Sequence, residues 1–302
     1  LRSVEALARH YDHEVKGLSV VKPLVGVHGD VTSTATVMRV RHHRDEGVVL
    51  AEGVHPYLSD LDARAMAEAC VDEAVRRVLC AGARLDRMAA LDNFCWPDPV
   101  KGAKNPDGDY KMGQLVRTCE GLYDICRAYG APLVSGKDSM KNDFRGLDQS
   151  GRPITISVLP TLMVTAMARG RTGIACGSDF KDAGDMIYLI GSDKTSFCAS
   201  EYAAQFRAPD DAPLPLDTAA AIHLYRRLHA ALSGDLLQSL HDLSDGGLLC
   251  AIAESMIGGR KGAHIESMDA RTAFGEAPAR FVASVSAAKA DAFETLMQGM
   301  PL

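Results

Sequence analysis

Four stretches of the chain carry apolar residues at the spacing of an α-helix: residues 60–80, 110–129, 216–232 and 248–257. In the first stretch one stripe holds Met66, Cys70, Ala74 and Val78, and Asp62 is among the candidate N-caps. The apolar face of the second stretch is formed by Met112, Leu115, Val116, Cys119, Leu122, Tyr123 and Cys126. This pattern predicts that both of its cysteines are core residues and that the helix ends at Gly130.

Apolar or alternating runs predict strands at residues 23–29, 32–40, 87–94, 154–168, 186–190 and 280–286. Pro160 interrupts the fourth run, which is therefore either two strands or one strand with a bulge. The residues from Pro132 to Val134 predict a short buried strand that stops at Gly136. Because β-rich runs and helices are followed by a second α/β unit, we expect two layered α+β domains, with a boundary near residue 175.

The composition is that of a globular protein, since 47% of the 302 residues are hydrophobic and 24% are charged. A net charge of -6 indicates no basic face for nucleic acid. None of the eight cysteines forms a Cys-x-x-Cys pair, so we expect reduced cytoplasmic thiols and no zinc site. No signal peptide or membrane-spanning apolar run is apparent. The chain begins at Leu1 and stops inside a helical pattern, which suggests a piece of a longer protein.

Polar residues with ligand-binding chemistry follow the short strand that ends near Val134: Gly136, Lys137, Asp138 and Ser139. Strand ends are where ligand groups converge in α/β layered folds, a glycine admits close approach, and a lysine suits a phosphate oxygen. The alternative is a polar turn closed by a local lysine–aspartate pair. A P-loop is excluded, because no earlier glycine has the required spacing and Asp138 interrupts the Gly-Lys-Ser order.

A second polar group, Asp242, Ser244 and Asp245, stands with two glycines just before the helix predicted over 248–257. It suits a phosphate bridged through magnesium to carboxylates, or it is an ordinary N-cap cluster. His241 is a weak candidate for a general base, because no nucleophile lies near it in the sequence.

Two further acids have plain structural interpretations from their positions. Asp30 follows Gly29 at a corner between two predicted strands, where turn aspartates are common. Glu73 precedes Arg77 by one helical turn, the spacing of a surface ion pair.

Five segments together carry a resemblance to a known family. SGKDSM at residues 135–140 resembles a signature in the second half of phosphoribosylformylglycinamidine synthase, the amidotransferase that makes formylglycinamidine ribonucleotide in purine synthesis. The other segments follow in that family's order: YDHEV at 11–15, SVVKPLVG at 19–26, LDNFCWPDP at 91–99 and HDLSDGGL at 241–248. Several independent motifs in one order form a far stronger signal than any single motif.

The resemblance implies the α+β fold of aminoimidazole ribonucleotide (AIR) synthetase, with an N-terminal domain over residues 1–175 and a C-terminal domain over 176–302. It implies ATP or ADP and Mg²⁺ as cofactors and assigns no catalytic residue to this half. The implied nucleotide or substrate contacts are Gly29, Gly136, Lys137, Asp138, Ser139 and Ser244, and the implied metal ligands are Asp30, Glu73 and Asp242. Arg77 departs from the family, which has an asparagine ligand there, and we expect it to weaken the metal site. Arg77 either takes the place of the cation, pairing with Glu73 and contacting phosphate directly, or turns outward and leaves a metal site with a water in place of the asparagine.

The function implied by the resemblance is that of an ATP-dependent carbon–nitrogen ligase. It converts formylglycinamide ribonucleotide and glutamine-derived ammonia into formylglycinamidine ribonucleotide. The alternatives are a catalytically silent nucleotide-binding half and another ATP-dependent enzyme of the AIR-synthetase superfamily. The implied partners are a first homologous half and a glutaminase domain or subunit, in the cytoplasm, with no nucleic acid or membrane. We expect the isolated piece to be inactive and to self-associate through the sheet that its partner normally covers.

Overall fold

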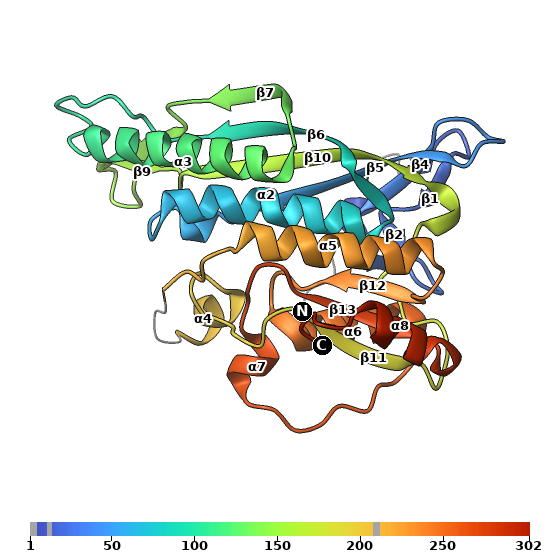
Figure 1. The fold of residues 1–302 in the computed structure, drawn as a ribbon. Coiled ribbons are helices and arrows are strands. Elements are labelled where there is room, and N and C mark those ends of the chain that lie inside the picture. Colours follow the sequence, from blue (N-terminus) through green and yellow to red (C-terminus); the bar gives the residue numbers. More distant parts are fainter. Residues whose placement is uncertain (1–4, 11–13, 208–211) are drawn as a thin grey trace.

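The computed structural model describes residues 5–10, 14–207 and 212–302, so Tyr11, Asp12 and His13 of the YDHEV segment lie outside the described residues. Its main element is a six-stranded sheet (Figure 1). The strands are ordered β1 (Ser19–Val21), β4 (Thr36–Arg39), β5 (Glu46–Val54), β10 (Thr161–Arg171), β6 (Ala83–Cys95) and β7 (Leu133–Ser139). All neighbours are antiparallel except β6 and β7, which are parallel.

Helices α2 (Ala63–Cys80) and α3 (Gly108–Tyr129) cover one face of this sheet (Figure 1). Alternate residues of the central strands are buried on that face, among them Val49 and Ala51 of β5 and Val164 of β10. Gly53 lets α2 approach closely, because a Cβ there would lie 2.1 Å from the carbonyl oxygen of Cys70. The strand residues that alternate with these buried ones face away from the two helices.

The predicted helices are confirmed with shifts of up to a few residues at their ends. Asp62 caps α2, since its carboxylate accepts from the backbone N–H groups of Arg64 and Ala65. Gly130 ends α3 in the left-handed conformation, with a φ of 64°. Helices α5 (Thr218–Ser233) and α6 (Gly247–Gly259) occupy the other two predicted stretches.

A second sheet carries the C-terminal residues. It is antiparallel and ordered β11 (Met186–Ile190), β13 (Phe281–Val285) and β12 (Ser239–Asp242). All five residues of β13 are buried, so the alternation predicted over 280–286 is wrong: this central strand is covered on both faces. Helix α5 lies between this sheet and the α2–α3 layer (Figure 1).

Short elements complete the chain: α1 (Glu5–Ala8), β2 (Leu24–Val25), β3 (Val31–Thr32), η1 (Pro56–Leu58), β8 (Asp143–Leu147), β9 (Pro153–Ser157), η2 (Thr172–Ile174), α4 (Glu201–Phe206), α7 (Ala270–Phe274), η3 (Ala287–Lys289) and α8 (Ala290–Leu296). Residues 154–168 are thus divided between β9 and β10, the two-strand alternative. Within the described ranges, no helix combines the length and apolarity needed to cross a bilayer.

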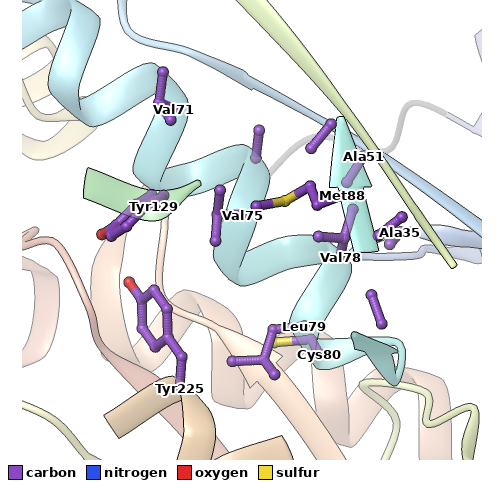
Figure 2. Packing of buried hydrophobic residues seen from close by; sticks show 14 of the residues in the cluster. Ala35, Ala51, Val71, Val75, Val78, Leu79, Cys80, Met88, Tyr129 and Tyr225 are labelled. Atoms are coloured by element: carbon purple, nitrogen blue, oxygen red, sulfur yellow. The ribbon is translucent and has the colours of Figure 1, made fainter. Parts of the chain in front are cut away.

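The largest hydrophobic core lies between the six-stranded sheet and helices α2 and α3, and it continues past α5 to the C-terminal sheet, where Leu240, Phe281 and Ala283 belong to it. Figure 2 shows Val71, Val75 and Val78 of α2 in this core, with Tyr129 and Tyr225 directed toward each other. The apolar face predicted for α3 is partly wrong, since Cys119 is exposed whereas Cys126 is buried, and Met112, Val116 and Tyr123 are exposed as well. The reason is that α3 packs against α2 through small and polar residues such as Thr118 and Gly121, which are buried. The two helices are close at Gly121, since a Cβ there would lie 2.8 Å from the carbonyl oxygen of Arg64. None of the eight cysteines, all of which lie in the described residues, forms a disulfide.

The strand predicted at Pro132–Val134 also differs from expectation. It continues through Ser139 as β7, at the edge of the sheet, and the side chains of Leu133 and Val134 are exposed. An edge strand has only one neighbour to cover it, so an apolar run there need not be buried.

Candidate functional site

Charged side chains of α2, which covers the six-stranded sheet, meet charged and polar side chains at the end of β12, in the C-terminal sheet. We call this group the α2–β12 cluster; its members are Asp72, Glu73, Arg76, Arg77, Asp242 and Ser244. Residues 72, 73, 76 and 77 lie within two turns of α2, so their side chains project from adjoining positions of one helix. Asp242 ends β12, and Ser244 follows it before α6 begins. The cluster thus joins the N-terminal and C-terminal units.

Glu73 is almost fully buried, and both of its oxygens have partners. Oε1 lies 3.0 Å from Arg77 Nη2, and Oε2 lies 3.2 Å from His55 Nε2. Oε2 also accepts the backbone N–H of Val54 at 2.9 Å. Burial by itself would raise the pKa of Glu73, but His55 and Arg77 outweigh it and lower the pKa to about 2. Glu73 is therefore held as a carboxylate.

Asp242 faces the same guanidinium from the other side. Its Oδ2 lies 3.4 Å from Arg77 Nε and accepts the hydroxyl proton of Ser244. The opposite oxygen lies 3.6 Å from His241 Nδ1. Burial would raise the pKa of Asp242, but Arg77, His241 and Arg76 hold it well below its usual range. The expected Glu73–Arg77 ion pair forms, but it is not a surface pair, because the side chain of Glu73 is only 3% exposed, and Asp242 is an additional partner.

His241 is flanked by acceptors, as Nε2 lies 3.0 Å from Glu254 Oε2 and Nδ1 lies 3.2 Å from Thr34 Oγ1. Burial opposes its protonation, but the hydrogen bonds and charges of Asp242 and Glu254 raise the pKa of His241 to about 9. An imidazole that is protonated at neutral pH is a hydrogen-bond donor, which agrees with the low weight given to His241 as a base.

Asp72 and Arg76 form the structural part of the cluster. Arg76 Nη1 donates to Asp72 Oδ2 at 2.5 Å, and the hydroxyl groups of Tyr129 and Tyr225 both donate to Oδ1. The backbone N–H of Ala279, before β13, donates to Oδ2 at 3.3 Å. Asp72 therefore connects α2 with α3, α5 and the C-terminal sheet.

Residues 135–139 of the SGKDSM segment lie on β7, away from this cluster, and Met140 follows the strand. Lys137 Nζ donates to Ser139 Oγ, and both side chains share a sheet face with Asn93 of β6. Asp138 pairs with Phe94 on the opposite face. Because β10 and β6 separate β5 from β7, three strand spacings, about 14 Å in all, lie between β7 and the strand that contacts Glu73.

Gly136 has a local packing role that the sequence did not indicate. A Cβ at this position would lie 2.2 Å from Asp92 Oδ1 on β6, so any side chain would displace that carboxylate. Burial, with a smaller contribution from Asp138, raises the pKa of Asp92.

The structure does not bring the three predicted metal ligands together. Asp30 lies at the expected corner, between β2 and β3, but its carboxylate accepts from Arg260, the residue that ends α6. Asp242 lies just before the other end of that 13-residue helix, about 20 Å away along its axis. The carbonyl of Gly29 accepts from Arg9 Nη2.

The α2–β12 cluster does not fit the Mg²⁺ that the resemblance implies. Among the described residues, no group of three His, Cys, Asp or Glu side chains is placed to hold a metal ion. Each carboxylate oxygen of Glu73 and Asp242 already has a partner, and a guanidinium lies between the two side chains. Magnesium requires oxygen ligands, and arginine has only donors. The residues as they stand do not fit the ion.

A cavity of about 500 Å³ adjoins the cluster on the side of His55, Arg76 and Ser244. Its other walls come from the start of α2 and from the apolar residues Leu214 and Leu216 before α5. Glu276 also lines it and accepts the backbone N–H groups of Gly246 and Glu201. Burial, opposed by the Gly246 hydrogen bond and assisted by Asp245, raises the pKa of Glu276 to about 7. A cavity of this size accommodates a small-molecule ligand.

Several residues of this site were not predicted from the sequence. Arg76 could have been noted, because it follows Asp72 by four residues and Glu73 by three, both of which are spacings of helical ion pairs. His55 and Glu276 carry no local signal, since they stand in irregular segments and meet the cluster only through the tertiary fold.

Comparison with known proteins gives two consecutive family matches. Residues 32–161 match the AIR synthase related protein, N-terminal domain, and residues 182–302 match the C-terminal domain of the same family. Among curated proteins, the phosphoribosylformylglycinamidine synthase subunit PurL of Alkaliphilus metalliredigens is 30% identical over 99% of this chain and 37% of its own length. The corresponding subunit of Thermoplasma acidophilum is 31% identical over 86% of this chain and 32% of its own length. The chain thus spans about a third of these relatives.

Solved structures agree on the fold. A structure described as T. maritima PurL complexed with FGAR covers 91% of this chain and 43% of its own, with a TM-score of 0.61 at 19% identity. Thiamine-monophosphate kinase from Stenotrophomonas maltophilia K279a covers 92% of this chain and 85% of its own, with a TM-score of 0.55 at 17% identity. With both domains matched in order along its length, this chain belongs to the AIR synthase related proteins.

Proposed function

We propose that this chain is the second AIR-synthase-like half of an ATP-dependent phosphoribosylformylglycinamidine synthase. The complete enzyme would convert formylglycinamide ribonucleotide, ATP and glutamine-derived ammonia into formylglycinamidine ribonucleotide. The observation that carries this proposal is the identity of about 30% to PurL subunits along almost the whole chain. The kinase of the same fold is a weaker guide, at 17% identity.

Within that enzyme, we assign this half the task of holding a nucleotide, for which ATP, ADP and AMPPCP complexes of a related PurL are a precedent. The α2–β12 cluster supports this assignment, because it presents a partly exposed guanidinium beside the Ser244 hydroxyl. Phosphate oxygens are natural acceptors for both groups. Gly29 and residues 136–139 remain predicted contacts, which the missing part of the protein would complete.

A second candidate is a nucleotide-binding half with no turnover of its own. Neutralisation of Glu73 and Asp242 by Arg77 favours it, since carboxylates already paired are poorly placed to recruit a metal to a reacting phosphate. Both candidates can hold together, with turnover in the first half and binding here.

The proposed partners are that first half and a glutaminase domain or subunit; a structure described as PurLQS of Thermotoga maritima is a related assembly. The open face of the six-stranded sheet supports a paired state, because Met38 of β4, Val54 of β5 and Met167 of β10 are exposed on it. The free thiols suit a cytoplasmic enzyme. Residues 1–175 and 176–302 stay our proposed domain division.

Calorimetric titration of the purified 302-residue chain with ADP tests the binding assignment. We expect saturable binding that Ser244→Ala weakens, and no formation of formylglycinamidine ribonucleotide from substrate, ammonia and ATP. Ser150→Ala, in the β8–β9 turn, is the matched control. Absence of ADP binding would remove the nucleotide role, and turnover by material free of host enzyme would show that this half is catalytically competent.

A further inference from the structure

The charged part of the α2–β12 cluster that solvent can reach is the cation. The side chain of Arg77 is 28% exposed, whereas those of Glu73 and Asp242 are 3% and 1% exposed. An incoming ligand therefore meets the guanidinium before it meets either carboxylate. This order is the one expected of a site for an anion, with the acids serving to hold the arginine.

The two acids fix the guanidinium from two directions. Arg77 Nη2 contacts Glu73 at 3.0 Å, Nε contacts Asp242 at 3.4 Å, and Nη1 donates to the carbonyl oxygen of Glu52 at 3.0 Å. Among the described residues, these contacts use three of the five N–H groups of the side chain. In the part of the chain that the structure describes, no contact uses the remaining two, and 28% of the side chain is exposed to solvent.

The position between the two carboxylates is where a divalent cation would lie if residue 77 supplied an oxygen. The glutamate, the aspartate and the hydroxyl of Ser244 are all oxygen donors, and Ser244 already contacts Asp242. The guanidinium of Arg77 pairs with both of these acids and supplies one positive charge, where a divalent cation would supply two, but it carries that charge as part of the protein. Its charge therefore needs no bound ion and does not depend on the metal concentration.

We propose that the Arg77 guanidinium takes the place of a divalent cation in this half, so that the chain binds the phosphates of a nucleotide without magnesium. This inference rests on the proposed function for the identity of the ligand. Whether residues 73, 77 and 242 bind a metal ion does not depend on the nucleotide, so metal binding can be measured in its absence.

Two variants and one control test it by ADP titration in magnesium and in EDTA. Wild-type affinity should be nearly the same in both. Arg77→Asn should lose about tenfold or more in EDTA and recover much of it with magnesium, because a charge-assisted hydrogen bond is lost and an oxygen ligand is gained. Arg77→Lys should stay independent of magnesium but bind more weakly, since it keeps the charge and loses the planar fork. The control, Arg152→Asn, removes an arginine from the exposed pair with Asp148 and should behave as wild type.

A second measurement uses Mn²⁺ alone, followed by electron paramagnetic resonance. The wild-type chain should not bind it at this site, and Arg77→Asn should gain a site. If ADP fails to bind under any condition, the proposed function fails and the Mn²⁺ measurement decides the inference by itself. The inference is overturned if wild-type ADP affinity collapses in EDTA, or if Arg77→Asn gains no metal. If Arg77→Asn does not fold, unchanged ADP affinity in Arg77→Lys overturns it.

Discussion

Replacing Asp72 by asparagine should cost more stability than almost any other single change of one charged side chain in this protein. The carboxylate is fully buried and holds Arg76, which is only 3% exposed, at 2.5 Å. Removing one partner of a buried pair leaves the other charge without compensation, which costs about 3–5 kcal/mol. Asp72 also accepts hydrogen bonds from Tyr129 and Tyr225, and hydrogen bonds to a charged group contribute about 1.5–3 kcal/mol each. The cost of the unpaired charge and the cost of the weakened hydrogen bonds are not additive, so we expect the free energy of unfolding to fall by an amount near the upper end of about 3–5 kcal/mol.

Urea unfolding followed by circular dichroism measures this loss as a change in the free energy of unfolding. The matched control is Glu68→Gln, which breaks the Arg64–Glu68 pair on the same helix at the same spacing. Those side chains are 37% and 26% exposed, so about 0.5 kcal/mol or less is expected. A double-mutant cycle of Asp72→Asn with Tyr225→Phe should show coupling, because both changes remove the same contact. A loss below about 1 kcal/mol for Asp72→Asn would refute the reasoning, since that is the range of exposed pairs.

Three further outcomes are expected. Folding raises the pKa of Glu276 from 4.5 to about 7, so the contribution of this group to the free energy of unfolding falls as pH rises from 4.5 through 7. In paired urea titrations, Glu276→Gln should therefore be more stable than wild type at pH 8 but not at pH 4. Gly53→Ala should destabilise the protein by about 2 kcal/mol or more in thermal unfolding, because the new Cβ would lie 2.1 Å from the Cys70 carbonyl oxygen. The control, Gly102→Ala, should be close to neutral, because its Cβ would meet nothing within 4 Å. The isolated chain should sediment as a dimer or larger species that Met167→Lys shifts toward monomer; a monodisperse wild-type monomer at micromolar concentration would contradict the paired-sheet proposal.

Much of the local structure followed from the sequence. The helical stripe through Met66, Cys70, Ala74 and Val78 fixed α2, and the cap at Asp62 and stop at Gly130 were correctly placed. Trp96, which the sequence places just after the strand predicted over 87–94, is fully buried, and its indole N–H donates to the backbone carbonyl of Lys111. These features depend on residues within a few positions of one another, which is why periodicity and capping chemistry reveal them.

The failures share one cause. Cys119 and Val134 lie in apolar patterns that a single sequence cannot distinguish from core, yet α3 turns its small residues toward α2 and β7 lies at a sheet edge. Which apolar face is covered depends on the neighbours of an element, and those neighbours are distant in the chain.

The candidate site divides in the same way. The sequence by itself placed Glu73 and Arg77 one helical turn apart, the spacing of an ion pair that the structure contains. Only the tertiary structure decided that Asp242, 165 residues beyond Arg77, completes the pair, and that Asp30 is held at the opposite end of α6 by Arg260. Side-chain chemistry and helical spacing are local properties of the chain, whereas the convergence of α2, β12 and α6 is set by how two sheets and their helices share one core.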